Sequence, residues 1–351
     1  MAHLKPNSII GILGGGQLGR MTAIAAAQLG YKVHVYTCEE ESPTAHIAYK
    51  TTVADYLDEE SLEQFAKEVA LVSFEFENIP YKTLEILEKY TKVAPSSKII
   101  KICQNRLREK DFINSQGIKT APYMVVSNKK DLEKAIAKIA VPCVLKTSEM
   151  GYDGKGQVKI DAKDQISDIS IEQECVLEGF VEFTKEISVI VARNEQGEIK
   201  AYHPVENIHK NHILDETIAP AIISPKLELE AVEIAIELAK GLELIGVLAV
   251  EMFVTKDGLL VNELAPRPHN SGHYTIDACV TSQFEQFVRA ICGLPLGSVN
   301  QHTKAVMKNL IGEEVNDIEK YIAEPDAKIH LYGKTHARKG RKMGHVTRLN
   351  A

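Results

Sequence analysis

The chain has 351 residues and a mass of 38.9 kDa, and 41 Lys and Arg against 48 Asp and Glu give a formal net charge of −7. A chain of this length predicts two or three domains with a sizeable buried core. Its 44% hydrophobic and 25% charged residues exclude a disordered, collagen-like or coiled-coil protein. The acidic balance gives no reason to expect a nucleic acid or a membrane surface as partner.

Cysteine usage and the N-terminal segment indicate the compartment. No two cysteines form a CxxC pair, and most lie in apolar or helical surroundings, which predicts reduced core thiols and neither disulfides nor a zinc site. The six are Cys38, Cys103, Cys143, Cys175, Cys279 and Cys292. The first residues lack a secretory pattern, and no apolar run reaches 18 residues. We therefore expect a cytoplasmic protein.

The first hundred residues alternate short apolar runs with helical patterns. Strands are predicted at 8–13, 32–36, 71–74 and 92–94, and helices at 17–29, 59–69 and 80–90. Strand and helix in alternation predict an α/β domain in which a parallel sheet carries helices on both faces, as in Rossmann-like folds.

The pattern changes near Pro95. One or two charged helices are predicted over 97–116 and another helix at 228–242. Strands are predicted at 141–146, 174–178, 184–193, 198–205, 245–254 and 259–264, before a mixed tail at 303–351 with a basic end. This central part reads as α+β. We expect domains at 1–100, 101–180 and 181–351.

A glycine motif follows the first predicted strand. Residues 14–19 read GGGQLG, satisfy GxGxxG and open a helix, and acidic residues follow at 39–41 beyond the second strand. This is the context of a dinucleotide site. The alternatives are a tightly packed Rossmann-like loop or a different phosphate at the helix N-terminus. The rest of the chain shows no hydride-transfer site.

A second glycine loop, GYDGKGQ at 151–157, links two predicted strands. Its three glycines permit positive φ and close backbone approach to a ligand, and Lys146 and Lys155 flank it with positive charge. Backbone amides in such a loop can surround phosphates. The alternative is an ordinary glycine-rich hairpin.

Two apolar strands flank the turn Lys256-Asp257-Gly258. A three-residue loop places Thr255 opposite Leu259, and counting along both strands then places Glu251 opposite Glu263. Opposed carboxylates among apolar residues need a cation, and paired carboxylates suit Mg²⁺ bound to substrate phosphates. The alternative is a solvent-facing sheet edge with two exposed glutamates.

The segment LAPRPHNSGH at 264–273 follows this hairpin directly. It gathers Arg267, His269, Asn270, Ser271 and His273 between stiffening prolines. Rigid loops rich in polar donors bind small anions or hold bases. Beside a metal-binding hairpin, this loop predicts an anion site.

Together these segments resemble the ATP-grasp superfamily and, within it, the N5-carboxyaminoimidazole ribonucleotide synthetases of purine biosynthesis. The matching segments span nearly the whole chain in the family's order: GGGQLGRM (14–21), FEFEN (74–78), GYDGKGQ (151–157), the hairpin with Glu251 and Glu263, NELAPRPHNSGH (262–273), SQFEQ (282–286) and GRKMGH (340–345). The resemblance implies an ATP-grasp fold in which 1–100 precede the grasp, 101–180 form its lid, and 181–351 form the large domain with a C-terminal substrate-binding segment.

The implied reaction is an ATP-dependent C–N ligation. ATP phosphorylates bicarbonate to carboxyphosphate, this releases CO₂ at the site, and the amine of 5-aminoimidazole ribonucleotide (AIR) captures it, giving N5-carboxyaminoimidazole ribonucleotide, ADP and phosphate. The resemblance implies ATP and Mg²⁺ as cofactors, AIR and bicarbonate as substrates, and a homodimer. Transferred phosphoryl charge calls for Mg²⁺, Lys and Arg, and a labile intermediate calls for a lid that excludes water.

The resemblance also assigns residues to roles. Glu251 and Glu263 would hold Mg²⁺, and Arg267, His269 and Asn270 would bind bicarbonate and carboxyphosphate, while Lys342 would reach the same site or the AIR phosphate. ATP would be bound by Arg106, Lys146, Gly151, Tyr152, Asp153, Gly154, Lys155, Gly156, Gln157, Glu178, Gly179, Phe180, Val181, Glu186, Asn262, Glu263 and His209, with His212 close to the last. AIR would meet Gln17, Glu75, Tyr152, Asp153 and Lys155.

Two departures and three alternatives accompany the resemblance. Met150 stands where the family usually has glycine, and relatives usually continue for about another helix beyond Ala351. If Met150 is strained, we expect altered lid opening or ATP affinity but no loss of activity. The alternatives are an ATP-grasp ligase that activates formate on glycinamide ribonucleotide, an NAD(P)-dependent oxidoreductase, and a non-catalytic nucleotide-binding regulator.

Overall fold

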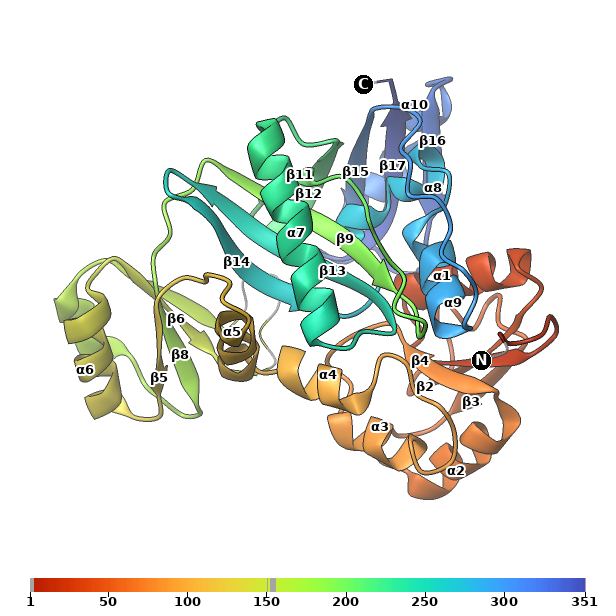
Figure 1. The fold of residues 1–351 in the computed structure, drawn as a ribbon, viewed down its shortest axis with the longest axis horizontal. Coiled ribbons are helices and arrows are strands. Elements are labelled where there is room, and N and C mark those ends of the chain that lie inside the picture. Colours follow the sequence, from red (N-terminus) through yellow and green to blue (C-terminus); the bar gives the residue numbers. More distant parts are fainter. Residues whose placement is uncertain (1–2, 150, 152–155, 351) are drawn as a thin grey trace.

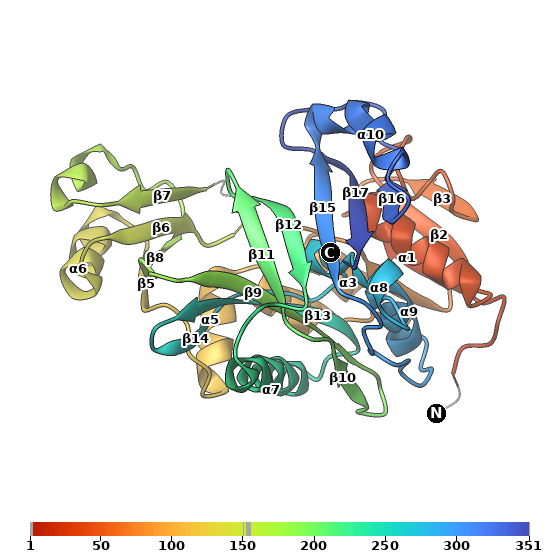
Figure 2. The same cartoon turned by 90° about the horizontal axis from the view of Figure 1, so that it is seen from above.

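The computed structural model describes residues 3–149, 151 and 156–350, and within them the strands form three sheets (Figure 1). Met150 and residues 152–155 of the second glycine loop, on which several predictions depend, lie outside the described residues. A small sheet lies at one end of the molecule and the N-terminal sheet at the other, with a large sheet between them (Figure 2). The fold mixes α/β and α+β parts, as predicted.

The N-terminal sheet is parallel throughout, with the order β3-β2-β1-β4. Its strands are β1 (Ile9–Leu13), β2 (Lys32–Thr37), β3 (Lys50–Val53) and β4 (Leu71–Phe74), and its helices are α1 (Gln17–Gln28), α2 (Glu59–Glu68) and α3 (Tyr81–Leu87). The predicted strand at 92–94 is wrong, because only one bridge joins Val93 to Val72. The prediction missed β3, whose polar, half-exposed sequence carries no apolar signal.

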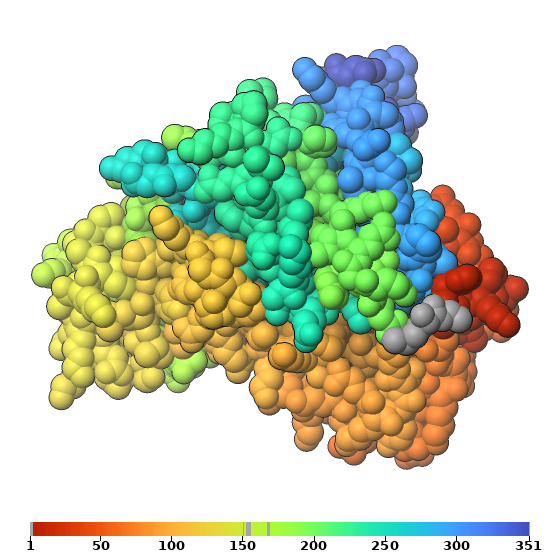
Figure 3. Space-filling view, in the orientation of Figure 1, coloured from red at the N-terminus to blue at the C-terminus, as the bar shows by residue number. Residues whose placement is uncertain are grey.

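The small sheet is antiparallel, with the order β5-β8-β6-β7. It consists of β5 (Tyr123–Val126), β6 (Cys143–Thr147), β7 (Gln157–Ile160) and β8 (Cys175–Gly179), with α6 (Lys129–Ile139) and the 3-10 turn η1 (Lys163–Asp168). Before it lie α4 (Ser97–Cys103) and α5 (Arg106–Ser115), so the span 97–116, predicted as one or two helices, contains two. Residues around 120–180, coloured yellow to yellow-green, form a lobe at one end of the molecule (Figure 3).

The large sheet is antiparallel, with the order β14-β13-β9-β11-β12-β15-β17-β16 and β10 added on β9. Its strands are β9 (Lys185–Arg193), β10 (Ile199–Ala201), β11 (Val205–Lys210), β12 (Ile213–Ala219), β13 (Gly246–Thr255), β14 (Gly258–Ala265), β15 (Ala305–Ile311), β16 (Ala327–Leu331) and β17 (Lys342–Leu349). The predicted strand at 198–205 is wrong, since two strands flank the break before Val205. Pro204 at that break has no N–H to donate to a ladder.

Helices cover the large sheet and join it to the N-terminal sheet. They are α7 (Pro225–Gly241), α8 (Thr275–Ala278), α9 (Gln283–Ile291) and α10 (Ile318–Ile322), with the 3-10 turns η2 (Asn270–Gly272) and η3 (Gly312–Asp317). One apolar core runs from Ile10 and Leu18 through to Phe284 and Phe287. This shared core fixes the N-terminal sheet against the large sheet.

The six cysteines are free. Four of them are buried, as expected for core thiols, whereas Cys103 is half-buried and Cys38 is exposed, so the prediction of a core position is wrong for Cys38. Within the described part of the chain no helix is long and apolar enough to cross a membrane.

Candidate active site

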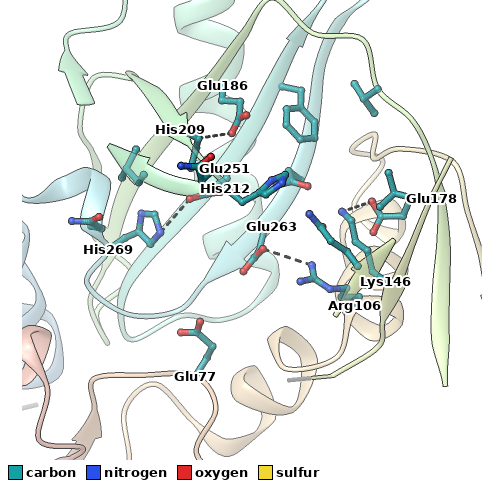
Figure 4. A pocket seen from close by; sticks show the side chains of 18 of the residues that line it. Glu77, Arg106, Lys146, Glu178, Glu186, His209, His212, Glu251, Glu263 and His269 are labelled. Atoms are coloured by element: carbon teal, nitrogen blue, oxygen red, sulfur yellow. Dashed lines mark hydrogen bonds and ion pairs between the residues drawn. The ribbon is translucent and has the colours of Figure 1, made fainter. Parts of the chain in front are cut away.

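A cavity of about 1030 Å³ opens between the three sheets. It is lined by the segment after β4, by β6 and β8 of the small sheet, by the β13–β14 hairpin and by the loop that follows that hairpin. Ionisable side chains from all three parts converge there (Figure 4). Chemistry that joins several small molecules needs such a site, because reactants must be held together and screened from water.

The acidic hairpin pairs Glu251 with Glu263, as predicted, although its turn differs. Thr255 pairs with Gly258, so the loop has two residues, and the register is recovered by a bulge between Glu251 and Met252. The predicted pairing of Thr255 with Leu259 is therefore wrong. The extra residue of the bulge is Asn262, which lines the cavity beside Glu263. A bulge changes the direction in which the neighbouring side chains point, and bulges are common next to active sites. Simple alternation along a strand does not predict this change of direction.

The two hairpin carboxylates lie opposite each other in the cavity wall. Burial, and then the nearby Glu263, raise the pKa of Glu251 to about 7. Arg106 Nη1 lies 3.7 Å from a Glu263 oxygen. Behind the hairpin, the buried Glu109 accepts the N–H of Leu264 at 2.7 Å, and burial followed by Glu263 raises its pKa to about 8. Such a concentration of carboxylates favours a bound cation.

Among the described residues, no group of three or more His, Cys, Asp and Glu side chains is arranged to hold a metal by itself. A pair of carboxylates nevertheless fits Mg²⁺, which keeps waters and takes further oxygens from phosphate. The Glu251–Glu263 pair is the donor set that suits such an ion.

The loop after β14 carries the predicted anion-binding residues into the same cavity. Both oxygens of the Glu77 carboxylate accept hydrogen bonds from Arg267, and Arg267 Nη1 donates to Pro268 O at 3.0 Å. Asn270 and Asn309 donate to each other's side-chain oxygens at 2.9 and 2.7 Å. These contacts fix the loop's side chains before any ligand arrives.

His269 is held in a defined tautomer. The Ser271 N–H donates to its Nδ1 at 3.3 Å, and Nε2 lies 3.2 Å from a Glu251 oxygen. Burial, followed by the charges of Arg267 and Lys342, lowers its pKa well below the usual value. His269 is therefore neutral and presents its Nε2–H toward the hairpin.

Buried polar side chains beneath His269 continue across the large sheet. Ser188 donates to Ser271 at 2.7 Å, Asn207 donates to Ser188 at 3.0 Å, and Thr217 donates to Asn207 at 3.2 Å. These side chains come from β9, β11 and β12. Sequence patterns missed this network because its members read as ordinary polar residues of strands.

The small sheet contributes a lysine–glutamate cluster. Glu178 accepts from Lys146 at 2.9 Å, and its other oxygen lies 3.3 Å from Lys110 Nζ. Burial opposes the charge of Glu178, but Lys146 and then Lys110 lower its pKa overall. Two cations at one carboxylate leave net positive charge on this wall, which suits phosphate.

On the opposite wall, His209 Nδ1 lies 3.0 Å from a Glu186 oxygen, and this contact raises the pKa of His209 against the effect of burial. Both His209 and His212 line the cavity. Phe183 and Phe253 stack there with ring centroids 4.7 Å apart. The sequence analysis missed both rings, although Phe253 lies two residues from Glu251 on the same strand and period-two alternation could have found it.

The first glycine loop does not offer a free helix N-terminus. The carboxylate of Glu75 accepts the N–H groups of Gly16 and Gly19, the latter at 2.9 Å. A Cβ added at Gly16 would come within 2.4 Å of a Glu75 oxygen. A side-chain carboxylate thus occupies the place where a dinucleotide site would bind pyrophosphate.

The cavity gathers most of the predicted site residues. Those lining it are Gln17, Glu75, Arg106, Lys146, Gln157, Glu178, Gly179, Phe180, Val181, Glu186, His209, Glu251, Asn262, Glu263, Arg267, His269, Asn270 and Lys342. Gly151 lines a smaller adjoining pocket, and Gly156 lies next to Thr147. Tyr152, Asp153, Gly154 and Lys155 lie outside the described residues.

Comparison with family models divides the chain into three matches. Residues 8–104 match the ribonucleotide synthetase pre-ATP-grasp domain, residues 111–284 the ATP-grasp domain, and residues 305–351 the phosphoribosylaminoimidazole carboxylase C-terminal domain.

Full-length relatives are similar over almost the whole chain. An N5-carboxyaminoimidazole ribonucleotide synthase of Bacillus subtilis is 46% identical over 98% of this chain and 92% of its own. A bifunctional purine synthesis protein of Dictyostelium discoideum is also 46% identical over 98% of this chain, which spans only 37% of that longer protein.

Solved structures agree with the sequence comparison. An N5-carboxyaminoimidazole ribonucleotide synthetase in complex with ADP superposes with a TM-score of 0.96 at 47% identity, covering 99% of this chain and 94% of that one. The Aspergillus clavatus synthase, solved with ADP and 5-aminoimidazole ribonucleotide, gives 0.91 at 30% identity over 98% and 94%. The chain therefore belongs to the N5-carboxyaminoimidazole ribonucleotide synthases, a family of ATP-grasp ligases.

Proposed function

We propose that this chain carboxylates 5-aminoimidazole ribonucleotide with bicarbonate and ATP, giving N5-carboxyaminoimidazole ribonucleotide, ADP and phosphate. One observation carries the proposal: the opposed Glu251 and Glu263 lie in one cavity with the Arg267–Asn270 loop and with Lys146. Phosphoryl transfer to a small anion needs a metal-binding group, an anion-binding group and a phosphate-binding group together.

ATP is proposed to lie between the small sheet and the acidic hairpin. Lys146, Arg106 and the loop at 151–157 would bind its phosphates, while residues 178–181, Glu186 and His209 would bind the nucleoside. Glu251 and Glu263, with Asn262 beside them, would hold Mg²⁺, which supplies charge stabilisation to the transferring phosphoryl group. The local excess of carboxylates supports this assignment.

Bicarbonate is proposed to lie against Arg267, His269 and Asn270. An oxygen of bicarbonate attacks the γ-phosphorus, the bond to ADP breaks, and carboxyphosphate forms. Neutral His269 suits this role, because it adds no positive charge that would compete with a bound cation for Glu251. Carboxyphosphate then releases CO₂ and phosphate, and the amine of AIR attacks the CO₂ carbon.

AIR is proposed to bind between the first glycine loop and the second, at Gln17, Glu75, Tyr152, Asp153 and Lys155, with Lys342 near its phosphate. Glu75 already accepts two backbone N–H groups, so its contribution is to shape the wall. We also propose the domains 1–100, 101–180 and 181–351, a homodimer, and a cytoplasmic location. Each proposed domain range holds one of the three sheets.

An ADP-release assay with MgATP and bicarbonate, with and without AIR, tests the proposal. We expect release to require bicarbonate and to rise at least about tenfold with AIR. Formate with glycinamide ribonucleotide is the parallel test for the formate-activating alternative. ADP release that does not depend on AIR, or that only formate with glycinamide ribonucleotide stimulates, would contradict the proposed carboxylation of AIR. The chain would then be an ATP-grasp ligase with another acceptor.

A further inference from the structure

The donor arrangement of Arg267 shows which part of it faces a ligand. A guanidinium carries five N–H groups in a fixed plane. Nε and Nη2 donate to the two oxygens of Glu77, the latter at 2.7 Å, and Nη1 donates to Pro268 O at 3.0 Å. These contacts use three of the five donors. One N–H on Nη1 and one on Nη2 have no acceptor among the described residues, and Arg267 lines the cavity.

Glu77 comes from the other side of the cavity. It follows β4 of the N-terminal sheet, whereas Arg267 follows β14 of the large sheet, and 190 residues separate the two in the sequence. Its backbone carbonyl, like that of Ile79, accepts from the side chain of Gln104, which fixes this segment in place. Figure 4 shows Glu77 projecting toward the site from the opposite wall to Glu251 and Glu263.

Two glutamates of the same segment face different partners. Glu75 turns toward the N-terminus of α1, and Glu77, two residues later, contacts Arg267. We call residues 264–273, the end of β14 and the loop after it, the anion loop. The segment that would shape the AIR side of the cavity therefore also fixes Arg267, the arginine of the anion loop. Glu77 and Arg267 are 21% and 14% exposed, so solvent screens their contact only partly.

We propose that Glu77 is a positioning residue for the bicarbonate site: its two-pronged contact fixes the plane of Arg267 so that the remaining two N–H groups meet a planar, three-oxygen anion. This rests on the proposed function. The pair has no net charge, so such a site selects an anion by the direction of its hydrogen bonds more than by charge. Bidentate pairing adds geometric specificity of this kind.

The first experiment measures ADP release against bicarbonate at saturating ATP and AIR for wild type, Glu77→Gln and Glu77→Ala. We expect the KM for bicarbonate to rise about tenfold or more in Glu77→Gln and further in Glu77→Ala, while the KM for ATP stays within twofold. Nitrate, which is also a planar three-oxygen anion, should inhibit both variants less strongly than wild type, because it needs the same fixed plane of Arg267.

Glu195→Gln is the matched control. Glu195 accepts a hydrogen bond from Lys92 at 2.9 Å, and this contact also joins the N-terminal part to the large sheet. Neither residue lines the cavity. We expect its KM for bicarbonate to match wild type. An equal effect in this control, or parallel increases in the KM values for ATP and bicarbonate in Glu77→Gln, would show general loosening and overturn the inference.

A double-mutant cycle with Arg267→Lys tests the pairing directly. Because lysine cannot make the two-pronged contact, Glu77→Gln should have little further effect in that background. Additive effects would contradict the inference.

Line broadening of [13C]bicarbonate in the presence of MgADP reports anion binding without turnover. It should be strong for wild type and weak for Glu77→Ala. If wild type shows no AIR-dependent activity yet this difference appears, the proposed function fails and the role of Glu77 stands. If broadening is equal in the two proteins, the role of Glu77 fails.

Discussion

The small sheet and the rest of the molecule are stabilised in different ways. The core of the small sheet consists only of side chains between Met124 and Leu177, whereas a single core joins the N-terminal sheet to α9 and the large sheet. Polar contacts bridge the small sheet to its neighbours, such as Lys110 with Glu178 and the Arg106 N–H with Ser148 O. The small sheet is thus a separately packed unit set against a larger rigid body.

This division follows the proposed chemistry. Lys146 and Glu178 lie on the small sheet, while the acidic hairpin and the anion loop belong to the rigid body. A unit with its own core can move without disturbing the other core, which suits a part that closes over ATP. Hydrogen bonds to a small anion instead require donors in fixed positions, and these lie on the rigid body. The predictions below test that division, from the largest expected effect to the smallest.

The largest effect is expected from Glu263→Gln on the rigid body. Losing one carboxylate of the proposed metal pair should lower ADP formation at least about a thousandfold. The fold should survive, because the change relieves repulsion from Glu251 and keeps the side chain's shape. ADP release and thermal unfolding measured on the same sample check this. Activity within tenfold of wild type would exclude Glu263 from the metal site.

Two core truncations compare the units directly. Phe287→Ala removes a buried ring from the shared core and should cost roughly 3–5 kcal/mol of the free energy of unfolding for the whole rigid body. Leu177→Ala removes a buried side chain from the small-sheet core at roughly 2–5 kcal/mol. The loss of stability should be confined to the small sheet. Leu177→Ala should therefore raise the KM for ATP more than the KM for bicarbonate.

Hydrogen exchange distinguishes these outcomes. Leu177→Ala should increase exchange in peptides from residues 123–179 and leave α9 and the large sheet protected. Phe287→Ala should raise exchange in both the N-terminal and the large sheet. If Leu177→Ala loosened all three sheets equally, the units would not be independent.

A matched pair of glutamines on α9 tests whether the anion loop needs its buried support. Gln283 accepts the His269 N–H at 2.9 Å and donates to His269 O at 2.7 Å. Gln286, on the same helix, makes the same two contacts with Gly297, at 2.7 and 2.8 Å. Both are fully buried. Only Gln283 supports a loop that lines the cavity.

Gln283→Met and Gln286→Met should each cost about 1–3 kcal/mol, because each leaves a buried N–H and C=O without a partner. Only Gln283→Met should raise the KM for bicarbonate, by about tenfold. Urea unfolding and steady-state kinetics of the two variants measure both effects. Equal kinetics in both variants would mean that the loop holds its shape without the Gln283 contacts.

Much of this architecture could be predicted from the sequence, and the failures have physical causes. The parallel N-terminal sheet followed from alternating apolar patterns, and the pairing of Glu251 with Glu263 from hairpin counting. The prediction missed α6, and it misjudged the turn because nothing in the sequence marks Asn262 as the bulged residue. Bulges depend on packing against neighbouring strands, which lie far away in sequence.

Long-range side-chain pairs were the hardest part to foresee. FEFEN was recognised as a segment, but that Glu77 meets Arg267 while Glu75 caps α1 depends on how two separate sheets dock. The glycines at 14–19 fitted a dinucleotide site in sequence, and the side chains of Glu75, Ser42 and Thr44 that pack against them show why they are small. Sequence identified the residue types of the site, whereas their partners came from tertiary packing.

The smallest expected effect is a difference in acid sensitivity between the two units. The rigid body contains buried histidines, and burial lowers the pKa of His34 to about 4 and those of His273 and His345 well below the usual value. The segment 123–179, which holds the small sheet, contains no histidine. In the unfolded chain each of these imidazoles takes up a proton near pH 6.5.

At these imidazoles the unfolded state binds more protons below that pH, so their contribution to stability is complete above pH 6.5 and is lost as the pH drops toward the folded-state pKa values. Glu251 and Glu109, whose pKa values are raised to about 7 and about 8, act in the opposite direction in the large sheet and beside it. Each buried histidine contributes a slope of at most about 1.4 kcal/mol per pH unit. Hydrogen exchange at pH 7.5 and 5.5, corrected for intrinsic rates, should therefore show protection lost first in the N-terminal sheet, which contains His34 and neither of these two glutamates. His34→Gln should reduce that loss in the N-terminal sheet, because one neutral buried imidazole is removed. If the small sheet lost protection first, groups other than these histidines would control acid stability, and the two units would be coupled more tightly than their separate cores indicate.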